Sequence, residues 1–105
     1  MPVNNQIPDY DLDKMVVVTA PGQLRALADP LRTTLLELLL ERAATVTEMA
    51  QAVDRPKSTV AYHVNLLVDA GLLRVVRTRR VRAIEERYYG RVARTIYIGA
   101  LNRPE

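Results

Sequence analysis

The sequence of 105 residues contains no cysteine, no phenylalanine and no tryptophan, and its only histidine is His63. Without cysteine the chain has no disulfide framework, no thiolate metal site and no cysteine nucleophile. A single histidine also excludes a multi-histidine metal site within one chain. We therefore expect no metal and no other cofactor. We also expect no enzyme, because catalysis needs converging acid, base or nucleophilic groups.

Long apolar runs are missing as well. No stretch approaches the roughly 20 apolar residues that a membrane-spanning helix needs. Carboxylates at Asp9, Asp11 and Asp13 precede a short apolar run, unlike the order in a signal peptide. We therefore expect a cytoplasmic protein with no membrane partner. Hydrophobic residues make up 49% of the chain, mostly aliphatic, which is enough for one small core of packed helices.

Charge is unevenly distributed along the chain. Residues 1–54 have four cations against eight carboxylates, a net charge of −4, whereas residues 55–105 have eleven cations against four carboxylates, a net charge of +7. This asymmetry favours a polyanionic partner that is bound by the second half. On charge alone, a solvated basic face without a ligand is an equally good interpretation.

Proline, glycine and apolar spacing predict the secondary structure of the first two thirds. Two prolines and runs of Asn and Asp predict a flexible arm over residues 1–20, although Met15 to Thr19 also suits an extended strand. Asp29 and Pro30 are typical of a helix start, and Thr47 is a candidate cap for a later helix. We predict four helices, at about 21–28, 30–42, 47–53 and 57–70.

Beyond the fourth helix the pattern changes to that of strands. Gly71 is expected to end the helix in the left-handed conformation. Leu72 to Val76 and Val81 to Tyr89 predict two antiparallel strands with a basic tip at Arg77–Arg80. Arg91 to Ile98 either continues the second strand or begins a third.

The predicted fold is mainly α with a small β-hairpin (α+β). The element order is α-α-(β)-α-α-β-β, where the bracketed strand is a short extended connection at Ala43 to Val46. Residues 21–98 form the predicted domain, between the arm and a C-terminal tail at 99–105. Two helices joined by a tight turn and followed by a hairpin make the winged helix-turn-helix arrangement.

Several sequence segments resemble ArsR-like winged helix-turn-helix transcriptional regulators, and the Arg- and Ala-rich composition suggests an actinobacterial type. The resemblance covers about residues 21–90. It rests on Leu27–Arg32 followed by Leu35, Leu36 and Leu39, on Thr47–Ala50, on Lys57–Val64, on Leu67 and on Ala70–Leu72.

The resemblance has consequences for the expected oligomeric state and for metal binding. It implies a homodimer, and the arm and the Arg91 to Leu101 stretch would have to help form it, because no long final helix is evident. Metal-sensing members carry paired cysteines in the helix before the turn, or carboxylate and histidine ligands in a C-terminal helix. This chain has neither set, so metal sensing does not carry over.

The fourth helix is the predicted recognition helix, whose N-terminal part enters the major groove of duplex DNA. Val60, Val64 and Leu67 define its buried side. Hydroxyls and a lysine beside free helix-terminal amides suit phosphate, whereas the aromatic rings suit base edges. The predicted DNA-binding residues here are Arg55, Lys57, Ser58, Thr59, Tyr62 and His63. The alternatives are that Ser58 or Thr59 only caps the helix, and that His63 packs against the preceding helix and bonds a carbonyl.

The predicted wing adds Arg77, Arg79, Arg80 and Arg82. Long cations near a hairpin tip reach phosphates or a narrow minor groove. Alternation places Arg77 and Arg79 on one face and Arg80 and Arg82 on the other, so about half are expected to contact DNA. The sequence thus predicts a nucleoid-associated, sequence-specific duplex DNA-binding transcriptional regulator. The alternatives are a winged-helix module that binds another protein, or the DNA-binding fragment of a longer effector-sensing regulator.

Overall fold

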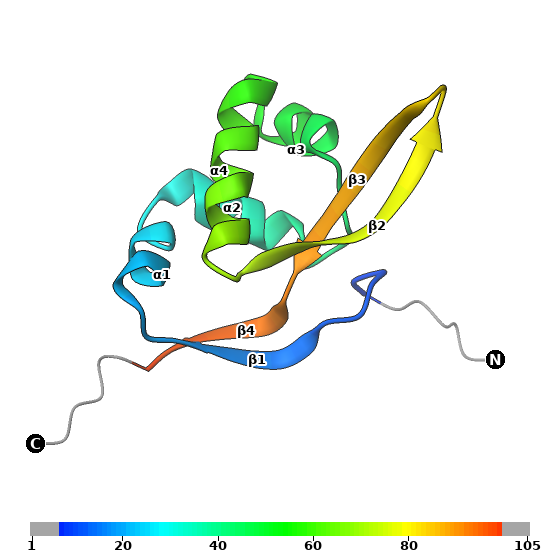
Figure 1. The fold of residues 1–105 in the computed structure, drawn as a ribbon. Helices are drawn as coiled ribbons and strands as arrows, with labels where there is room; N and C mark the ends of the chain where they lie inside the picture. Colours follow the sequence, from blue (N-terminus) through cyan, green and yellow to red (C-terminus); the bar gives the residue numbers. More distant parts are fainter. Residues whose placement is uncertain (1–6, 100–105) are drawn as a thin grey trace, which may run out of the picture.

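The structure is a computed structural model that describes residues 7–99. Residues 1–6, the start of the predicted arm, and residues 100–105, most of the predicted tail, lie outside the described residues. The elements are β1 (Asp13–Val18), α1 (Pro21–Ala26), α2 (Pro30–Leu38), α3 (Val46–Val53), α4 (Lys57–Asp69), β2 (Leu73–Val81), β3 (Ile84–Arg91) and β4 (Ala93–Ile98). Figure 1 shows the helices grouped together, the β2–β3 hairpin projecting to one side, and β1 and β4 side by side beneath them.

The core lies where α2, α3 and α4 meet the base of the hairpin. Leu35 and Leu39 of the α2 region have no exposed surface, and neither do Val60, Val64 and Leu67 of α4. The buried stripe predicted for α4 is therefore confirmed. Because burying each such side chain contributes about 1.5–3 kcal/mol, this aliphatic contact fixes α4 against α2 without any phenylalanine or tryptophan.

The ends of the helices follow local side-chain chemistry. Asp29 caps α2 by accepting hydrogen bonds from the N–H groups of Leu31 (2.8 Å) and Arg32 (3.2 Å). The Arg32 N–H bond, together with that of Leu31, holds the pKa of the Asp29 carboxyl below its ordinary value. Gly71 adopts a φ of +77° just beyond α4, as predicted. None of the helices in the described part of the chain is long and apolar enough to cross a bilayer.

The predicted cap of α3 was wrong by two residues. Thr45, not Thr47, is the N-cap, and Thr45 and Glu48 form a reciprocal capping box. The extended connection before the helix is short, because Ala44 already bridges to Tyr89 of β3. That bridge confirms the bracketed strand of the predicted order and lets α3 begin at Val46.

The predicted hairpin tip at Arg77–Arg80 was also wrong. Those residues lie within β2, where Arg77 faces Tyr88 and Arg80 faces Glu85, and the turn itself is made by Arg82 and Ala83. Both turn residues have positive φ, 53° and 70°. Two left-handed residues match the twist of a tight hairpin. This turn is normally marked by Asn or Gly, so its sequence signal was missing here.

Replacing Ala83 with glycine is expected to stabilise the protein by about 1 kcal/mol. The Cβ of Ala83 makes its φ of 70° costly, and glycine adopts this conformation without that cost. The midpoint of urea unfolding should rise with an unchanged slope. As a control, Ala52→Gly in the exposed, right-handed backbone of α3 should lose about 1 kcal/mol. An unchanged or lower midpoint for Ala83→Gly would contradict the turn described here.

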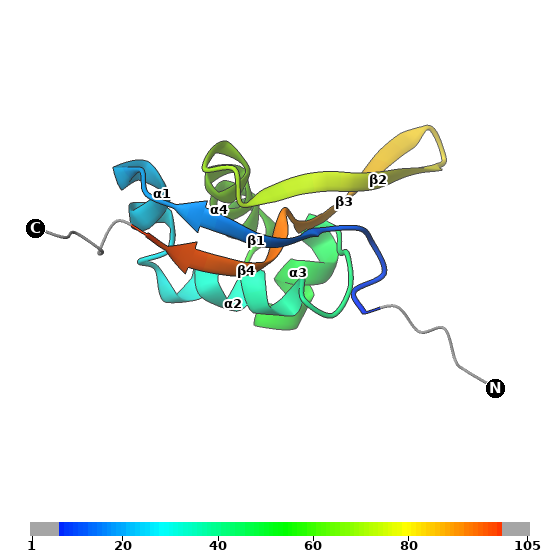
Figure 2. The same cartoon turned by 90° about the horizontal axis from the view of Figure 1, so that it is seen from below.

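The N-terminal segment is not a flexible arm over its described part, contrary to the prediction. β1 pairs in parallel with β4, in a register from Asp13 opposite Ala93 to Val18 opposite Ile98. Val18 has no exposed surface and Tyr10 is 7% exposed. Within the stretch Arg91 to Ile98, Arg91 ends β3 and Ala93–Ile98 forms the separate strand β4. The two-stranded sheet β1–β4 closes the domain beneath the helices, as the view from below shows (Figure 2).

Candidate nucleic-acid interface

The exposed start of α4 brings together most of the predicted recognition residues. Lys57 and Ser58 are exposed, Thr59 is partly exposed, and the Tyr62 side chain is 61% exposed. The N-cap is Pro56, which makes no side-chain cap hydrogen bond, and the first turn has no acidic residue. The alternative role of Ser58 or Thr59 as a helix cap is therefore wrong. The first-turn amides and Lys57 form a positive helix end that suits a phosphate.

The turn between α3 and α4 holds Arg55 at the surface. Asp54 ends α3 in the left-handed conformation, with a φ of 56°, as its short polar side chain allows. The Arg55 N–H then donates to the carbonyl of Ala50 at 3.1 Å. This bond fixes the backbone of the turn against α3 while the Arg55 residue remains exposed.

His63 lies beside Tyr62 and is half-buried. Its ring meets that of Tyr62 edge to face, with centroids 5.2 Å apart. Its Nδ1 atom lies 2.9 Å from Nη1 of Arg32, which comes from α2. His63 thus contacts the preceding part of the fold through a guanidinium, not through a carbonyl as the alternative had it. Arg32 was missed by the sequence analysis, since nothing local to α2 or α4 indicates a contact 31 positions apart.

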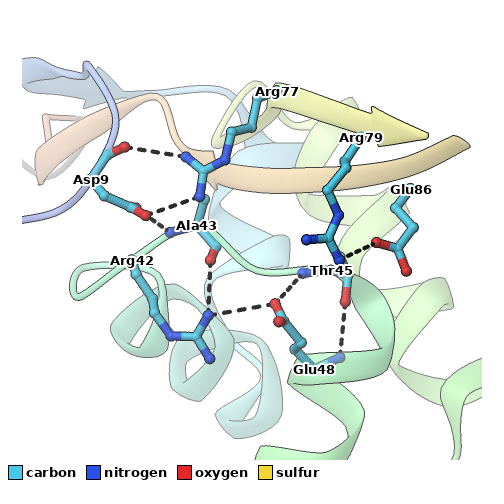
Figure 3. A network of polar contacts seen from close by, with 8 residues as sticks. All are labelled: Asp9, Arg42, Ala43, Thr45, Glu48, Arg77, Arg79 and Glu86. Atoms are coloured by element: carbon cyan, nitrogen blue, oxygen red, sulfur yellow. Dashed lines mark hydrogen bonds and ion pairs between the residues drawn. The ribbon is translucent and has the colours of Figure 1, made fainter. Parts of the chain in front are cut away.

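Two of the four wing arginines are held by carboxylates. As alternation predicted, Arg77 and Arg79 share one face of the hairpin, where their guanidinium carbons lie 5.0 Å and 5.9 Å from the ring centre of Tyr88. Arg77 pairs with Asp9 at 2.9 Å and Arg79 pairs with Glu86 at 3.2 Å (Figure 3). Arg80 and Arg82 are exposed, and neither has an ion-pair partner among residues 7–99.

Asp9 links the wing to the N-terminal segment and to the connection before α3. Besides Arg77, its carboxylate accepts the N–H of Ala43 at 2.8 Å (Figure 3). Burial raises the pKa of Asp9, but the Ala43 hydrogen bond and the Arg77 guanidinium outweigh it and hold that pKa below its ordinary value. The base of the wing is therefore anchored, whereas its tip carries cations that are available to a ligand.

Arg91 belongs to the core rather than to a surface site. It is 6% exposed, and its guanidinium donates to the carbonyls of Leu36 (3.0 Å), Ala93 (3.0 Å) and Arg94 (2.8 Å). Burial lowers the pKa of Arg91. Its role is to satisfy carbonyl groups of α2 and of the segment that leads from β3 into β4, so part of the basic excess of residues 55–105 is structural.

Comparisons with known proteins decide the kind of fold. The family described as "Helix-turn-helix domain" matches residues 27–76, from the end of α1 into β2. The homodimeric winged helix-turn-helix DNA-binding domain Mb0332 from Mycobacterium bovis, a possible ArsR-family transcriptional regulator, is a solved structure with 25% identity. It matches over 69% of this chain and 62% of that chain, with a TM-score of 0.57. The chain carries an ArsR-like winged helix-turn-helix domain. In this winged-helix domain α3 and α4 form the helix-turn-helix, and β2 and β3 form the wing.

Two further solved structures have the same winged-helix fold. NolR from Sinorhizobium fredii has 27% identity over 70% of this chain and 68% of that chain, with a TM-score of 0.57. The transcriptional repressor BigR from Xylella fastidiosa has 26% identity over 66% of this chain and 63% of that chain, with a TM-score of 0.53. The match thus spans less than two thirds of the Mb0332 and BigR chains. No curated protein matches the sequence significantly.

Proposed function

We propose that the protein is a sequence-specific duplex DNA-binding transcriptional regulator. One observation carries the proposal: the start of α4, which has no capping side chain and no acidic residue, lies on the same side of the domain as the wing tip. That tip carries Arg80 and Arg82, which have no ion-pair partner among residues 7–99. Figure 1 places α4 and the tip of the β2–β3 hairpin on the upper side of the domain, opposite β1 and β4. In this arrangement α4 enters the major groove with Tyr62 and His63 toward the bases, while the wing tip follows the adjacent backbone.

The alternative function is a winged-helix module that binds another protein, since a fold does not establish a function. Retention on a column of immobilised duplex DNA separates the two. The proposal expects retention that falls steeply with added salt, because bound phosphates release counterions. A protein that passes through the column at low salt would favour the protein-binding module.

We propose further that the protein acts as a homodimer, as the similarity to homodimeric Mb0332 supports. Two recognition helices that read two half-sites gain affinity and specificity. The candidate interface is the β1–β4 sheet, whose outer face exposes Met15 (54%), Val17 (50%) and Tyr97 (49%). Both of its strands also have an unpaired edge among residues 7–99, and such edges are normally covered. By similarity to the repressor BigR, we expect repression.

The double variant Val17→Glu, Tyr97→Glu is expected to be monomeric. Two carboxylates on this sheet face would repel their copies across a two-fold axis and would be costly to bury. Sedimentation equilibrium gives the mass directly. Tyr62→Glu is the control, because Tyr62 is similarly exposed but lies on α4, and it should keep the wild-type mass. A wild-type protein that is monomeric at micromolar concentration, or a double variant that remains dimeric, would contradict this interface.

A further inference from the structure

Arg32 is positioned to control the hydrogen-bonding character of His63 on the recognition helix. Its guanidinium is held by three acceptors. Nε donates to the carbonyl of Ala26 at 2.7 Å, and Nη2 donates to the carbonyl of Arg25 at 3.3 Å. Both carbonyls belong to the last turn of α1. The Arg25 carbonyl also accepts the N–H of Ala28 at 3.1 Å, whereas residue 30, where the next helical N–H for the Ala26 carbonyl would lie, is a proline. The third contact is the 2.9 Å contact of Nη1 with Nδ1 of His63.

This contact selects one tautomer of the ring. An arginine side chain has only donors and keeps its proton in proteins. Nδ1 of His63 must therefore accept the hydrogen bond, which corresponds to the tautomer with its proton on Nε2. No side-chain nitrogen or oxygen that is buried among residues 7–99 lacks a hydrogen-bond partner. Because Nε2 has no partner among these residues, it is not fully buried and is able to donate to a ligand.

We propose that Arg32 is a specificity-determining positioning residue that fixes His63 as a hydrogen-bond donor, so that α4 selects an acceptor atom on a base. In the major groove the acceptors are N7 of either purine, O6 of guanine and O4 of thymine, whereas cytosine presents an amino donor. A histidine free to change its tautomer accepts from cytosine as readily as it donates to a purine. The fixed donor removes that choice and disfavours cytosine at the contacted position.

This inference rests on the proposed function, but its first step is testable without DNA. His63 is the only histidine in the chain, so ¹H–¹⁵N correlation spectra of the free protein contain a single imidazole. At neutral pH we expect one tautomer, with Nδ1 unprotonated and Nε2 protonated. Arg32→Leu should return the ring to a mixture, whereas Arg25→Leu, which removes a neighbouring exposed cation, should leave the tautomer unchanged. A protonated Nδ1 in the wild-type protein, or no change in Arg32→Leu, would overturn the proposal.

The second step uses duplexes selected from a random pool by the wild-type protein. His63→Ala and Arg32→Leu should weaken discrimination against cytosine at the same single position, each about fivefold, as expected for one hydrogen bond. The double variant should lose no more than either single variant, because Arg32 acts through His63. The salt dependence of binding should stay the same. Effects at different base positions, or losses that add in the double variant, would show that Arg32 and His63 act independently and would overturn the proposal. A slope of log K against log salt that falls by about 0.9 would show a phosphate contact and would also overturn it.

One further variant and the wild-type protein separate the possible causes of failure. Arg32→Lys serves as the test if Arg32→Leu folds poorly. It keeps the charge and one donor, so it should retain more of the discrimination against cytosine than Arg32→Leu does. A wild-type protein that selects no sequence would refute the proposed function and the reading of a base by His63. The tautomer measured in the free protein would still decide whether Arg32 fixes the ring.

Discussion

Replacing both Arg80 and Arg82 with alanine is expected to weaken binding to every duplex sequence by about tenfold or more at 0.1 M salt. Each cation at the wing tip that meets a phosphate contributes about 0.9 to the slope of log K against log salt. If both contact the backbone, the slope falls by about 1.8. Alanine at position 82 keeps the strain of the left-handed turn unchanged, so the loss reports charge rather than a new conformation.

The matched control removes the same charge from the same hairpin. Arg77 and Arg79 already pair with Asp9 and Glu86 and lie against Tyr88. Arg77→Ala, Arg79→Ala should therefore lower the slope by less than the tip variant does. Fluorescence anisotropy of labelled duplex at several salt concentrations gives both slopes. Equal slopes for the two double variants would contradict the division of the wing into an anchored base and an available tip.

Replacing Tyr10 with alanine is expected to cost about 3–5 kcal/mol of the free energy of unfolding, the range for removing a large buried ring. The ring lies directly over Gly90, where an added Cβ would come within 2.6 Å of it. Its hydroxyl accepts the N–H of Arg91 at 2.9 Å and donates to the carbonyl of Leu39. Burial raises the pKa of Tyr10, although the Arg91 N–H and guanidinium oppose the shift. Tyr10 thus joins the N-terminal segment to both α2 and β3.

Tyr10→Phe separates the ring from its hydroxyl. This variant keeps the packing over Gly90 but leaves two buried backbone groups without a partner, at a cost of about 1–3 kcal/mol. Urea unfolding should show both losses as lower midpoints with little change of slope. If Tyr10→Ala unfolds at the wild-type midpoint, the N-terminal segment is a dispensable arm, as the sequence alone suggested.

The parts of the fold that depend on neighbouring residues were predictable. The spacing of Val60, Val64 and Leu67 identified the buried side of α4, because a helix places such residues on one face. Asp29 and Gly71 marked helix ends through their own backbone and side-chain preferences. From these local signals the element order of the central region and the winged helix-turn-helix fold follow.

The parts that depend on distant partners were not predictable from these patterns. β1 has the sequence of a short apolar run, and only its pairing with β4 makes it a strand of the domain. Asp9 lies 68 positions from Arg77, so nothing in the Arg-rich run showed which cations are paired. The hairpin turn was misplaced for a different reason, because Arg82 and Ala83 adopt left-handed backbone without the residues that usually announce it.

Selection of bound sequences from a random duplex pool tests sequence-specific DNA binding most directly. The wild-type protein should enrich one motif, as two half-sites with centres one helical turn or a multiple of it apart if the dimer binds. Tyr62→Ala, in the same experiment, should lose enrichment at one position of each half-site while keeping its affinity for random DNA. A pool that shows no enriched motif after repeated rounds with the wild-type protein would contradict the account.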